Sequence, residues 1–507
     1  MRLQAFPFVP VIAIAMEIGS AVDAPARRNE RWETLMNYPS FRLFRTALVS
    51  VAVSLFISLS FAANPARPNL LLIIADDLTK WDTSVYGGQA ATPNLDKLAR
   101  EGMKFTHCFQ AAPSCSPTRH ALYTSLYPVK SGAHPNHTFV KDGVRSVAHW
   151  LKAAGYRAAL SGKTHINPPE AFPFEYSLER SSGSTNPDFA AVDKFLGECA
   201  AAATPFGLIL ASNEPHTPWN LGDSSAYPPE RVVLPPLYPD TPETRANFSK
   251  YLAEVTYFDR QVGQALELLA RYKLDRSTMV VVITEQGSSF PFAKWTCYDA
   301  GVGSGMIIRW PGRVVAGSTS AALVEYIDIM PTFLQAAGIN VPNGLDGRSF
   351  LPVLEGRASK HKDYVFSLHT TRGIINGSPY YGTRSVRDAR YRYIRNLTPE
   401  ITFSNAATRG DIWESWVAAA KAGDPVAREA VSRYQHRPAE ELYDAEADRW
   451  NARNLAGDPA LATVKARLSA QVDAWMKAQG DGGQATELDA DNRQWKATKS
   501  GKSKKEP

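Results

Sequence analysis

Residues 69–77 read Asn-Leu-Leu-Leu-Ile-Ile-Ala-Asp-Asp, an apolar run that stops abruptly at two aspartates. Such an uninterrupted run is typical of a strand buried on both faces of a mostly parallel sheet, because an exposed face would show polar residues in alternation. Similar runs recur downstream at 157–161, 206–211 and 279–284. The chain is therefore expected to build a buried, mostly parallel sheet.

Amphipathic helices are expected between these strands. Apolar residues recur at spacings of three and four in 92–102, in 147–155 and, over the longest stretch, in 244–272. This alternation of strands and helices predicts an α/β fold, in which helices sandwich a large mixed, mostly parallel sheet.

The sequence changes character after a charged stretch at 357–363, where we place a domain boundary. Residues 63–357 are expected to form the main α/β domain. Residues 358–480 are expected to form a smaller C-terminal subdomain of antiparallel strands plus a last helix at 460–479. The polar, lysine-rich residues 481–507 are expected to be a disordered tail.

The N-terminal region has the pattern of a secretion signal. An uncharged, mostly apolar stretch at 46–63 follows two arginines and contains the small-residue cleavage pattern Ser60-Phe61-Ala62. We interpret residues 1–62 as an extension plus signal peptide, with Met36 as a candidate true start. This predicts a periplasmic or secreted protein with no membrane span in the mature chain; a single membrane anchor is the alternative.

Composition excludes several classes of protein. The 507 residues are 44% hydrophobic and 21% charged, with a net charge of +6, as in a globular protein with a substantial core. No basic stripe with interleaved aromatic residues is present, so no nucleic-acid partner is expected. The cysteines lack any Cys-x-x-Cys metal spacing and are too few for a disulfide scaffold; they are Cys108, Cys115, Cys199 and Cys297.

Polar clusters follow four of the predicted strands, at 76–77, 162–165, 213–216 and 285–287. Each cluster alone has an ordinary structural explanation, such as a helix cap. Together they would meet at one sheet edge, where open α/β sheets bind ligands. Oxygen ligands from two different strands predict a Ca²⁺ or Mg²⁺ site.

The pentad Cys115-Ser116-Pro117-Thr118-Arg119 adds a nucleophile to this edge. Pro117 suits the first turn of a helix. Cys115 would then lie at the positive helix end, which favours an anion. Arg119 would follow one turn later on the same face.

Cys-x-Pro-x-Arg resembles the signature of the type I, formylglycine-dependent sulfatases. Family-like motifs span nearly the whole mature chain: 67–69, 76–77, 92–96, 162–165, 309–312 and 441–444. Other segments look closest to the heparan N-sulfatase (sulfamidase) branch: 171–174, 214–216, 234–242 and 257–263. The resemblance implies the alkaline-phosphatase-like form of the α/β fold.

Three positions depart from the family pattern. Ser125 stands where Gly is usual, and Thr164 replaces the common Trp after Lys163. Glu285-Gln286 stands where Asp followed by His or Asn is usual. Glu and Gln keep oxygen ligands on longer arms, so a hard cation still fits this site.

The resemblance also implies a mechanism. A maturation enzyme, either formylglycine-generating or anaerobic, would convert Cys115 to formylglycine. Its hydrate would attack sulfur, form a covalent sulfo-enzyme and then expel sulfate. The family's metal set maps onto Asp76, Asp77, Cys115, Glu285 and Gln286, holding Ca²⁺ or, less favoured, Mg²⁺.

Further site residues come from the same resemblance. Arg119, Lys163 and Lys294 would supply positive charge to the sulfate. His165 would steady the hydrated aldehyde, and His216 would protonate the leaving group. The expected substrate-binding residues are Glu214, His369 and Arg384.

The branch resemblance predicts a sulfated carbohydrate substrate: sulfate esters or sulfamates at the end of a glycan such as heparan sulfate, with N-sulfoglucosamine as a candidate. Arylsulfatase and phosphonate or phosphodiester hydrolase are the alternatives within the superfamily. A non-catalytic glycan-binding relative is the alternative from another class, and Glu285-Gln286 is its only support.

Overall fold

The structure is a computed structural model that describes residues 67–176 and 185–494. The expected extension and secretion signal at 1–62 lie outside these residues. Among the helices of the described part, none combines the length and apolar character needed to cross a membrane.

The main sheet contains nine strands within the described residues. In spatial order they are β4 (Glu175–Tyr176), β3 (Arg157–Gly162), β5 (Phe206–Ala211), β1 (Asn69–Ala75), β6 (Thr278–Thr284), β7 (Gly303–Arg309), β2 (Met103–Phe109) and β8 (Ser318–Ser320), with β9 (Val324–Glu325) also paired to β2. The first five strands in this spatial order, from β4 through β3, β5 and β1 to β6, are mutually parallel. Strand β7 runs antiparallel to both of its neighbours, β6 and β2. The predicted mixed, mostly parallel sheet is confirmed.

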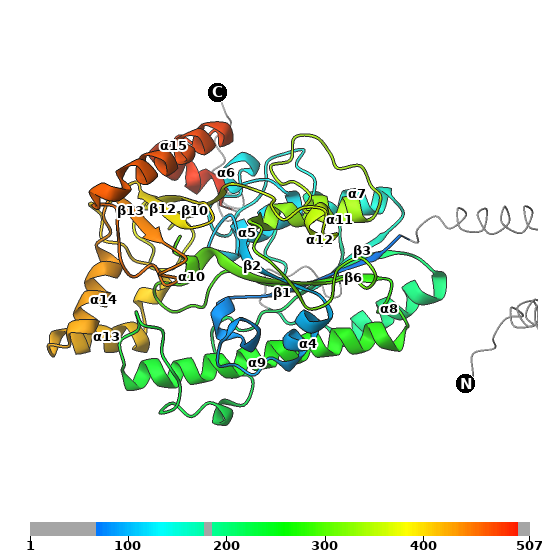
Figure 1. Cartoon of the computed structure of the whole chain (residues 1–507), viewed down its shortest axis with the longest axis horizontal. Helices are drawn as coiled ribbons and strands as arrows, with labels where there is room; N and C mark the ends of the chain where they lie inside the picture. The colour runs from blue at the N-terminus through cyan, green and yellow to red at the C-terminus, as the bar shows by residue number, and fades with distance from the viewer. Residues whose placement is uncertain (1–66, 177–184, 495–507) are drawn as a thin grey trace, which may run out of the picture. The chain divides into compact units, whose positions relative to one another are not determined.

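Helices cover both faces of this sheet (Figure 1). Successive side chains of β1 point to opposite faces, so Leu72 and Leu71 enter separate cores. The Leu72 face packs on α5 (Cys115–Thr124), α7 (Val147–Ala153), α11 (Ile329–Ala336) and α12 (Leu351–Leu354). The Leu71 face packs on α4 (Pro93–Glu101), α8 (Phe189–Ala202) and α9 (Pro242–Arg271). This double coverage is why the strands read as continuous apolar runs.

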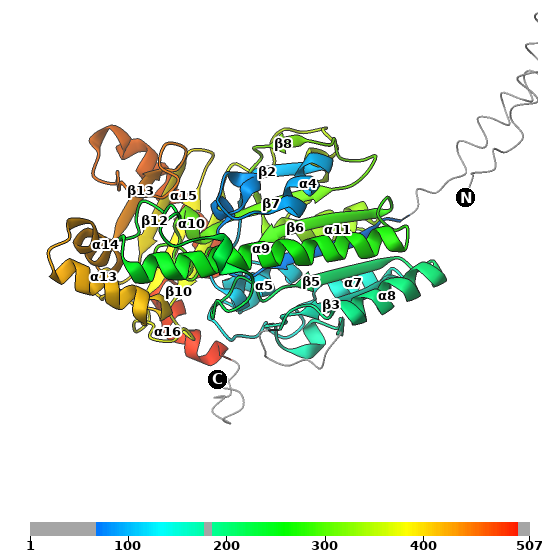
Figure 2. The same cartoon turned by 90° about the horizontal axis from the view of Figure 1, so that it is seen from below.

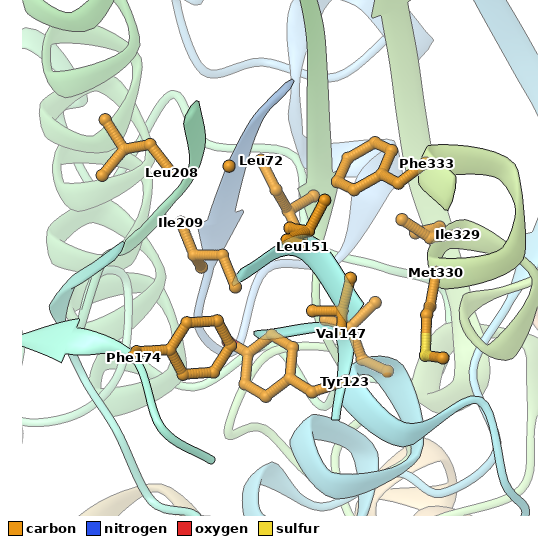
Figure 3. A pocket seen from close by; sticks show the side chains of 12 residues that line it. Leu72, Tyr123, Val147, Leu151, Phe174, Leu208, Ile209, Ile329, Met330 and Phe333 are labelled. Atoms are coloured by element: carbon orange, nitrogen blue, oxygen red, sulfur yellow. The ribbon is translucent and has the colours of Figure 1, made fainter. Parts of the chain in front are cut away.

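A small cavity remains in the core on the Leu72 face (Figure 3). Apolar side chains from β1, β5, α5, α7 and α11 converge on it, among them Leu72, Val147 and Phe333. None of the described residues that line it carries a charge. We therefore assign it to core packing and not to the site chemistry.

A second, four-stranded antiparallel sheet follows in the chain. Its strands are β10 (Val365–Thr370), β11 (Gly382–Arg387), β12 (Tyr391–Asn396) and β13 (Glu440–Asp444). Helix α15 (Ala462–Gln479) packs on it through Leu468 and Val472. Helices α13 (Asp411–Lys421) and α14 (Pro425–Gln435) lie at the outer end of this part of the molecule (Figure 2).

The prediction of a disordered tail is wrong for residues 481–494. They form α16 (Gln484–Asp489) and a 3-10 turn, η8 (Ala490–Arg493). Asp481 and Glu487 both pair with the fully buried Arg384 on β11. The polar composition suggested solvation, but both carboxylates instead pair with one buried arginine far away in the sequence. Residues 495–507 lie outside the described part.

Candidate active site

The strand register brings the predicted clusters to one edge of the main sheet. Ala75 pairs with Thr284, and Ile74 pairs with Ala211, which in turn pairs with Gly162. Strands β1, β3, β5 and β6 therefore end together. The residues that follow each strand start from the same edge, as the sequence predicted.

Cys115 is the first residue of α5, whose ten residues are all buried. Only 4% of Cys115 is exposed. Its Sγ lies 3.4 Å from Asp76 Oδ1, 3.0 Å from Gln286 Nε2 and 3.9 Å from Lys163 Nζ. The predicted helix start is confirmed, and it points a thiol into a ring of polar groups. All four cysteines are buried and free.

Two buried lysines face the aspartate pair. Lys163 Nζ pairs with Asp76, and Lys294 Nζ lies 2.6 Å from Asp77 Oδ2. Ser289 Oγ donates a hydrogen bond of 2.7 Å to the same Asp77 oxygen. His216 Nε2 lies 3.7 Å from it. Positive groups fixed in a nearly closed site suit the binding of a tetrahedral anion.

The buried charges shift one another's pKa values. Burial alone would raise the pKa of Asp76, but Lys163 and further neighbours outweigh it and hold that pKa well below its usual range. Burial and then the charge of Asp76 raise the pKa of the Cys115 thiol to about 12. The unmodified thiol is thus protonated at neutral pH, and a thiol is a weaker nucleophile than a thiolate.

Glu285 differs from the expected metal ligand. Its Oε1 lies 2.8 Å from Arg119 Nε, and its Oε2 accepts a hydrogen bond of 3.2 Å from Nη2. Both side chains are almost fully buried. The longer arm of Glu reaches the guanidinium, so this carboxylate neutralises Arg119. Arg119 also donates to the backbone oxygen of Lys163 at 3.0 Å.

The remaining donors fit a hard divalent cation. Four side chains place their possible ligand atoms within 4.8 Å of one another. They are Asp76, Asp77, Cys115 and His216. Gln286 Nε2 donates to Asp76 Oδ1 at 3.0 Å and Asp77 Oδ1 at 2.7 Å, while its buried Oε1 has no hydrogen-bond partner. A half-turn of this amide would aim Oε1 at the carboxylates, and only a cation between them would stabilise three oxygens so placed.

The backbone at the site adopts unusual conformations. Asp77 (φ 62°) and His165 (φ 51°) are left-handed non-glycine residues, which cluster at functional sites. At Gly162 a Cβ would collide with the carbonyl oxygen of Ala211, so only glycine lets β3 end there and present Lys163. Ser125, at φ 60° after α5, explains why the family usually has glycine there.

His165 lies against a residue that the sequence analysis did not single out. Its Nε2 is 3.0 Å from His137 Nδ1, and its backbone oxygen accepts a hydrogen bond from Ser116 Oγ at 3.1 Å. His137 lies in an irregular loop with no motif to signal it. Ser289 was missed as well, although the polar run Gly287-Ser288-Ser289 beside Glu285-Gln286 was a usable signal.

The three expected substrate-binding residues are all buried and already contact other parts of the fold. Glu214 is 4% exposed, and its Oε1 accepts a hydrogen bond of 2.9 Å from Asn186. His369 is 1% exposed, and burial lowers its pKa to about 3. Arg384 is fully enclosed by its carboxylate partners. These side chains are held inside the fold by polar or aromatic neighbours that the sequence did not reveal.

Known proteins share both the sequence and the architecture. The family model "Sulfatase" matches residues 68–339, and "N-sulphoglucosamine sulphohydrolase, C-terminal" matches 287–403. An ulvan-active sulfatase of Formosa agariphila is 31% identical, over 82% of this chain and 81% of its own. The N-sulphoglucosamine sulphohydrolase of Homo sapiens is 29% identical, over 81% and 90%.

A solved structure, of a protein in complex with its substrate D-glucosamine-2-N,6-O-disulfate, has the same fold. The TM-score is 0.62 at 17% identity, and the match covers 82% of this chain and 99% of that one. With the family model and the curated relatives, this likeness bears out the resemblance drawn from Cys115 and its motif. The chain belongs to the sulfatase family, near its N-sulphoglucosamine sulphohydrolase branch, and is a hydrolase of sulfate esters or sulfamates.

Proposed function

We propose that this enzyme removes sulfate from a sulfated glycan, with formylglycine derived from Cys115 as its nucleophile. The observation that carries the proposal is the position of Cys115, at the buried start of α5 within hydrogen-bonding distance of Asp76 and Gln286. The names of the relatives support a glycan substrate, because they include ulvan-active sulfatases and an N-sulphoglucosamine sulphohydrolase.

The residues around Cys115 would have two kinds of role: some would stabilise negative charge, and others would transfer a proton. Hydrated formylglycine supplies the hydroxyl group that attacks sulfur. Lys163 and Lys294 would bind sulfate oxygens and offset the charge that develops on them. His216, whose side chain is 26% exposed, stands where it can hold a proton on Nε2 for the departing oxygen or nitrogen.

The metal part of the proposal rests on Asp76, Asp77 and Gln286. A bound divalent cation supplies Lewis acidity toward the sulfate oxygens. Ca²⁺ is favoured over Mg²⁺, because Ca²⁺ tolerates the irregular geometry of carboxylate and amide oxygens drawn from two strands. Arg119, whose charge is neutralised by Glu285, would lie behind these metal ligands and support their positions.

The compartment and the maturation partner are further parts of the proposal. The apolar stretch at 46–63, with the cleavage pattern at 60–62, supports export to the periplasm or the medium. A formylglycine-generating or anaerobic maturation enzyme would act on Cys115. Fractionation of cells expressing the full chain, followed by N-terminal sequencing of the exported form, tests the export.

The decisive experiment combines peptide mass and product release. Mass spectrometry of the peptide containing Cys115 should show the aldehyde. Purified enzyme should release sulfate from N-sulfated or O-sulfated saccharides faster than it cleaves a matched aryl phosphonate. An unmodified thiol, or preference for the phosphonate, would refute the proposal. Binding of the saccharide without any turnover would favour the non-catalytic alternative.

Replacing Glu285 by aspartate should weaken calcium binding by about 10-fold, although it restores the residue usual in the family. Aspartate is too short to keep both contacts with Arg119. The freed guanidinium, 3.9 Å from Asp76 Oδ1, would then compete with the cation for that carboxylate. Calorimetric titration of Ca²⁺ into both proteins measures the change. Tighter binding by the Asp variant would mean that Glu285 is a poor ligand and not a partner of Arg119.

Replacing Glu214 by alanine should lower the turnover of a sulfated saccharide and of a small aryl sulfate by a similar factor, about 10-fold. Glu214 holds Asn186 and the loop that carries His216, so both substrates depend on it equally. Glu214→Gln keeps an oxygen for Asn186 and should lose less. The measurement is the ratio of kcat/KM for the two substrates. A loss confined to the saccharide would instead show that Glu214 reads the sugar.

A further inference from the structure

The last described turn of the chain reaches back to a loop beside the active site. Arg493 Nε donates to the backbone oxygen of Gly132 at 2.8 Å, and Nη2 donates to that of Phe139 at 3.0 Å. Its guanidinium also lies over the Phe139 ring, 4.4 Å from the centroid. One side chain therefore holds both ends of the loop 132–139, more than 350 residues away in the sequence.

Arg493 and the backbone of the loop pack closely against each other. Gly132 has φ 82°, and a Cβ there would press against the Arg493 guanidinium. Thr138 Oγ1 returns a hydrogen bond of 2.8 Å to the backbone oxygen of Arg493, and Thr138 also forms an antiparallel bridge with Gln494. The contact thus involves backbone and side chains on both partners.

The loop in turn touches two parts of the active site. Its His137 Nδ1 lies 3.0 Å from His165 Nε2. Its Thr138 N–H donates at 3.4 Å to Ser116 Oγ, which itself donates to the backbone oxygen of His165. Ser116 directly follows Cys115. The loop therefore connects the start of α5 with the His165 ring.

The segment that carries Arg493 is itself anchored. Asp491 pairs with Arg372 and accepts a hydrogen bond from Tyr380 at 3.0 Å. Asp481 and Glu487 pair with the buried Arg384 on β11. Residues 481–494, which we call the C-terminal strap, are thus fixed to the second sheet by ion pairs and to the active-site loop by Arg493.

We propose that Arg493 is a positioning residue of the active site, which fixes the 132–139 loop so that His137 holds the His165 ring in one orientation. The proposal rests on the proposed function, because it assigns His165 to the catalytic step. A ring that is displaced by about 1 Å loses alignment with the reacting group, and such a displacement can cost up to about 100-fold in rate.

The test replaces Arg493 by glutamine and uses a small aryl sulfate as probe. We expect kcat to fall by about 10- to 100-fold while KM stays within about 2-fold, because binding charges at Lys163 and Lys294 are untouched. Arg467→Gln, the same chemical change at an exposed arginine that pairs with Asp388, is the control and should match wild type. Hydrogen exchange should quicken in the 132–139 loop without a matching change in the strands of the main sheet.

A double-mutant cycle with His137 separates positioning from general stability. His137→Ala should lower kcat by a similar factor, His137→Asn should retain part of it through an amide near the Nδ1 position, and adding Arg493→Gln to His137→Ala should cost little more. Wild-type kcat in either single variant would overturn the proposal, as would full additivity. If Arg493→Gln does not fold, the exposed His137 variants decide the matter. An inactive wild-type enzyme with intact formylglycine would instead refute the proposed function.

Discussion

Replacing Cys115 by alanine is expected to abolish sulfate release, with a loss in kcat of at least about 10⁴-fold, while the fold is retained. Among the described side chains gathered at this sheet edge, no other nucleophile stands at the start of a helix. The change removes one sulfur atom from a buried position, so Tm should fall by only a few degrees. Turnover of a small aryl sulfate and circular dichroism at increasing temperature measure both quantities.

Two further variants sharpen this test. Cys199→Ala removes another buried, free cysteine, one that lies on α8 away from the site, and should leave activity unchanged. Cys115→Ser should be nearly as damaging as Cys115→Ala where the host's maturation system does not oxidise serine. Full activity in Cys115→Ala would eliminate the nucleophilic mechanism.

Replacing Asp77 by asparagine should remove the bound cation and lower kcat/KM by at least about 100-fold. Asparagine keeps the shape of the side chain and an acceptor for Ser289, but it loses the negative charge. Lys294 would then be buried without its partner, and one carboxylate ligand would be lost. Metal content by mass spectrometry and activity at increasing Ca²⁺ measure the two effects.

The control for this variant is Asp193→Asn, the same change at a surface carboxylate that pairs with Arg271. It should leave metal content and activity unaltered. Treating the wild-type enzyme with a chelator should reproduce the loss, and added Ca²⁺ should restore activity. Fully active enzyme that contains no divalent cation would contradict the metal assignment.

Patterns within short stretches of sequence predicted most of the fold. The run at 69–77 predicted β1, and Cys115-Ser116-Pro117 predicted the start of α5, because burial on both faces and helix initiation are local properties. The convergence of Asp76, Lys163 and Gln286 followed from the common direction of parallel strands.

Contacts between distant segments could not be predicted in the same way. Residues 481–494 look solvated because their composition is polar, and only the fold brings Arg384 to Asp481 and Glu487. Likewise, the sequence shows that Glu285 is longer than Asp but not that its extra methylene reaches Arg119. Nothing near Arg493 in the sequence signals a loop that lies 361 residues earlier.

The C-terminal strap also determines how late in synthesis the contacts around the active site can be completed. A ribosome adds about 5–20 residues per second, so the 361 residues between Gly132 and Arg493 take roughly 20 to 70 s to synthesise. Throughout that interval the 132–139 loop lacks its contacts with Arg493. Until β6 has been synthesised, the Cys115 thiol also lacks Gln286 as a neighbour. The proposed maturation enzyme would therefore have a period of tens of seconds in which to reach a thiol that the finished protein encloses.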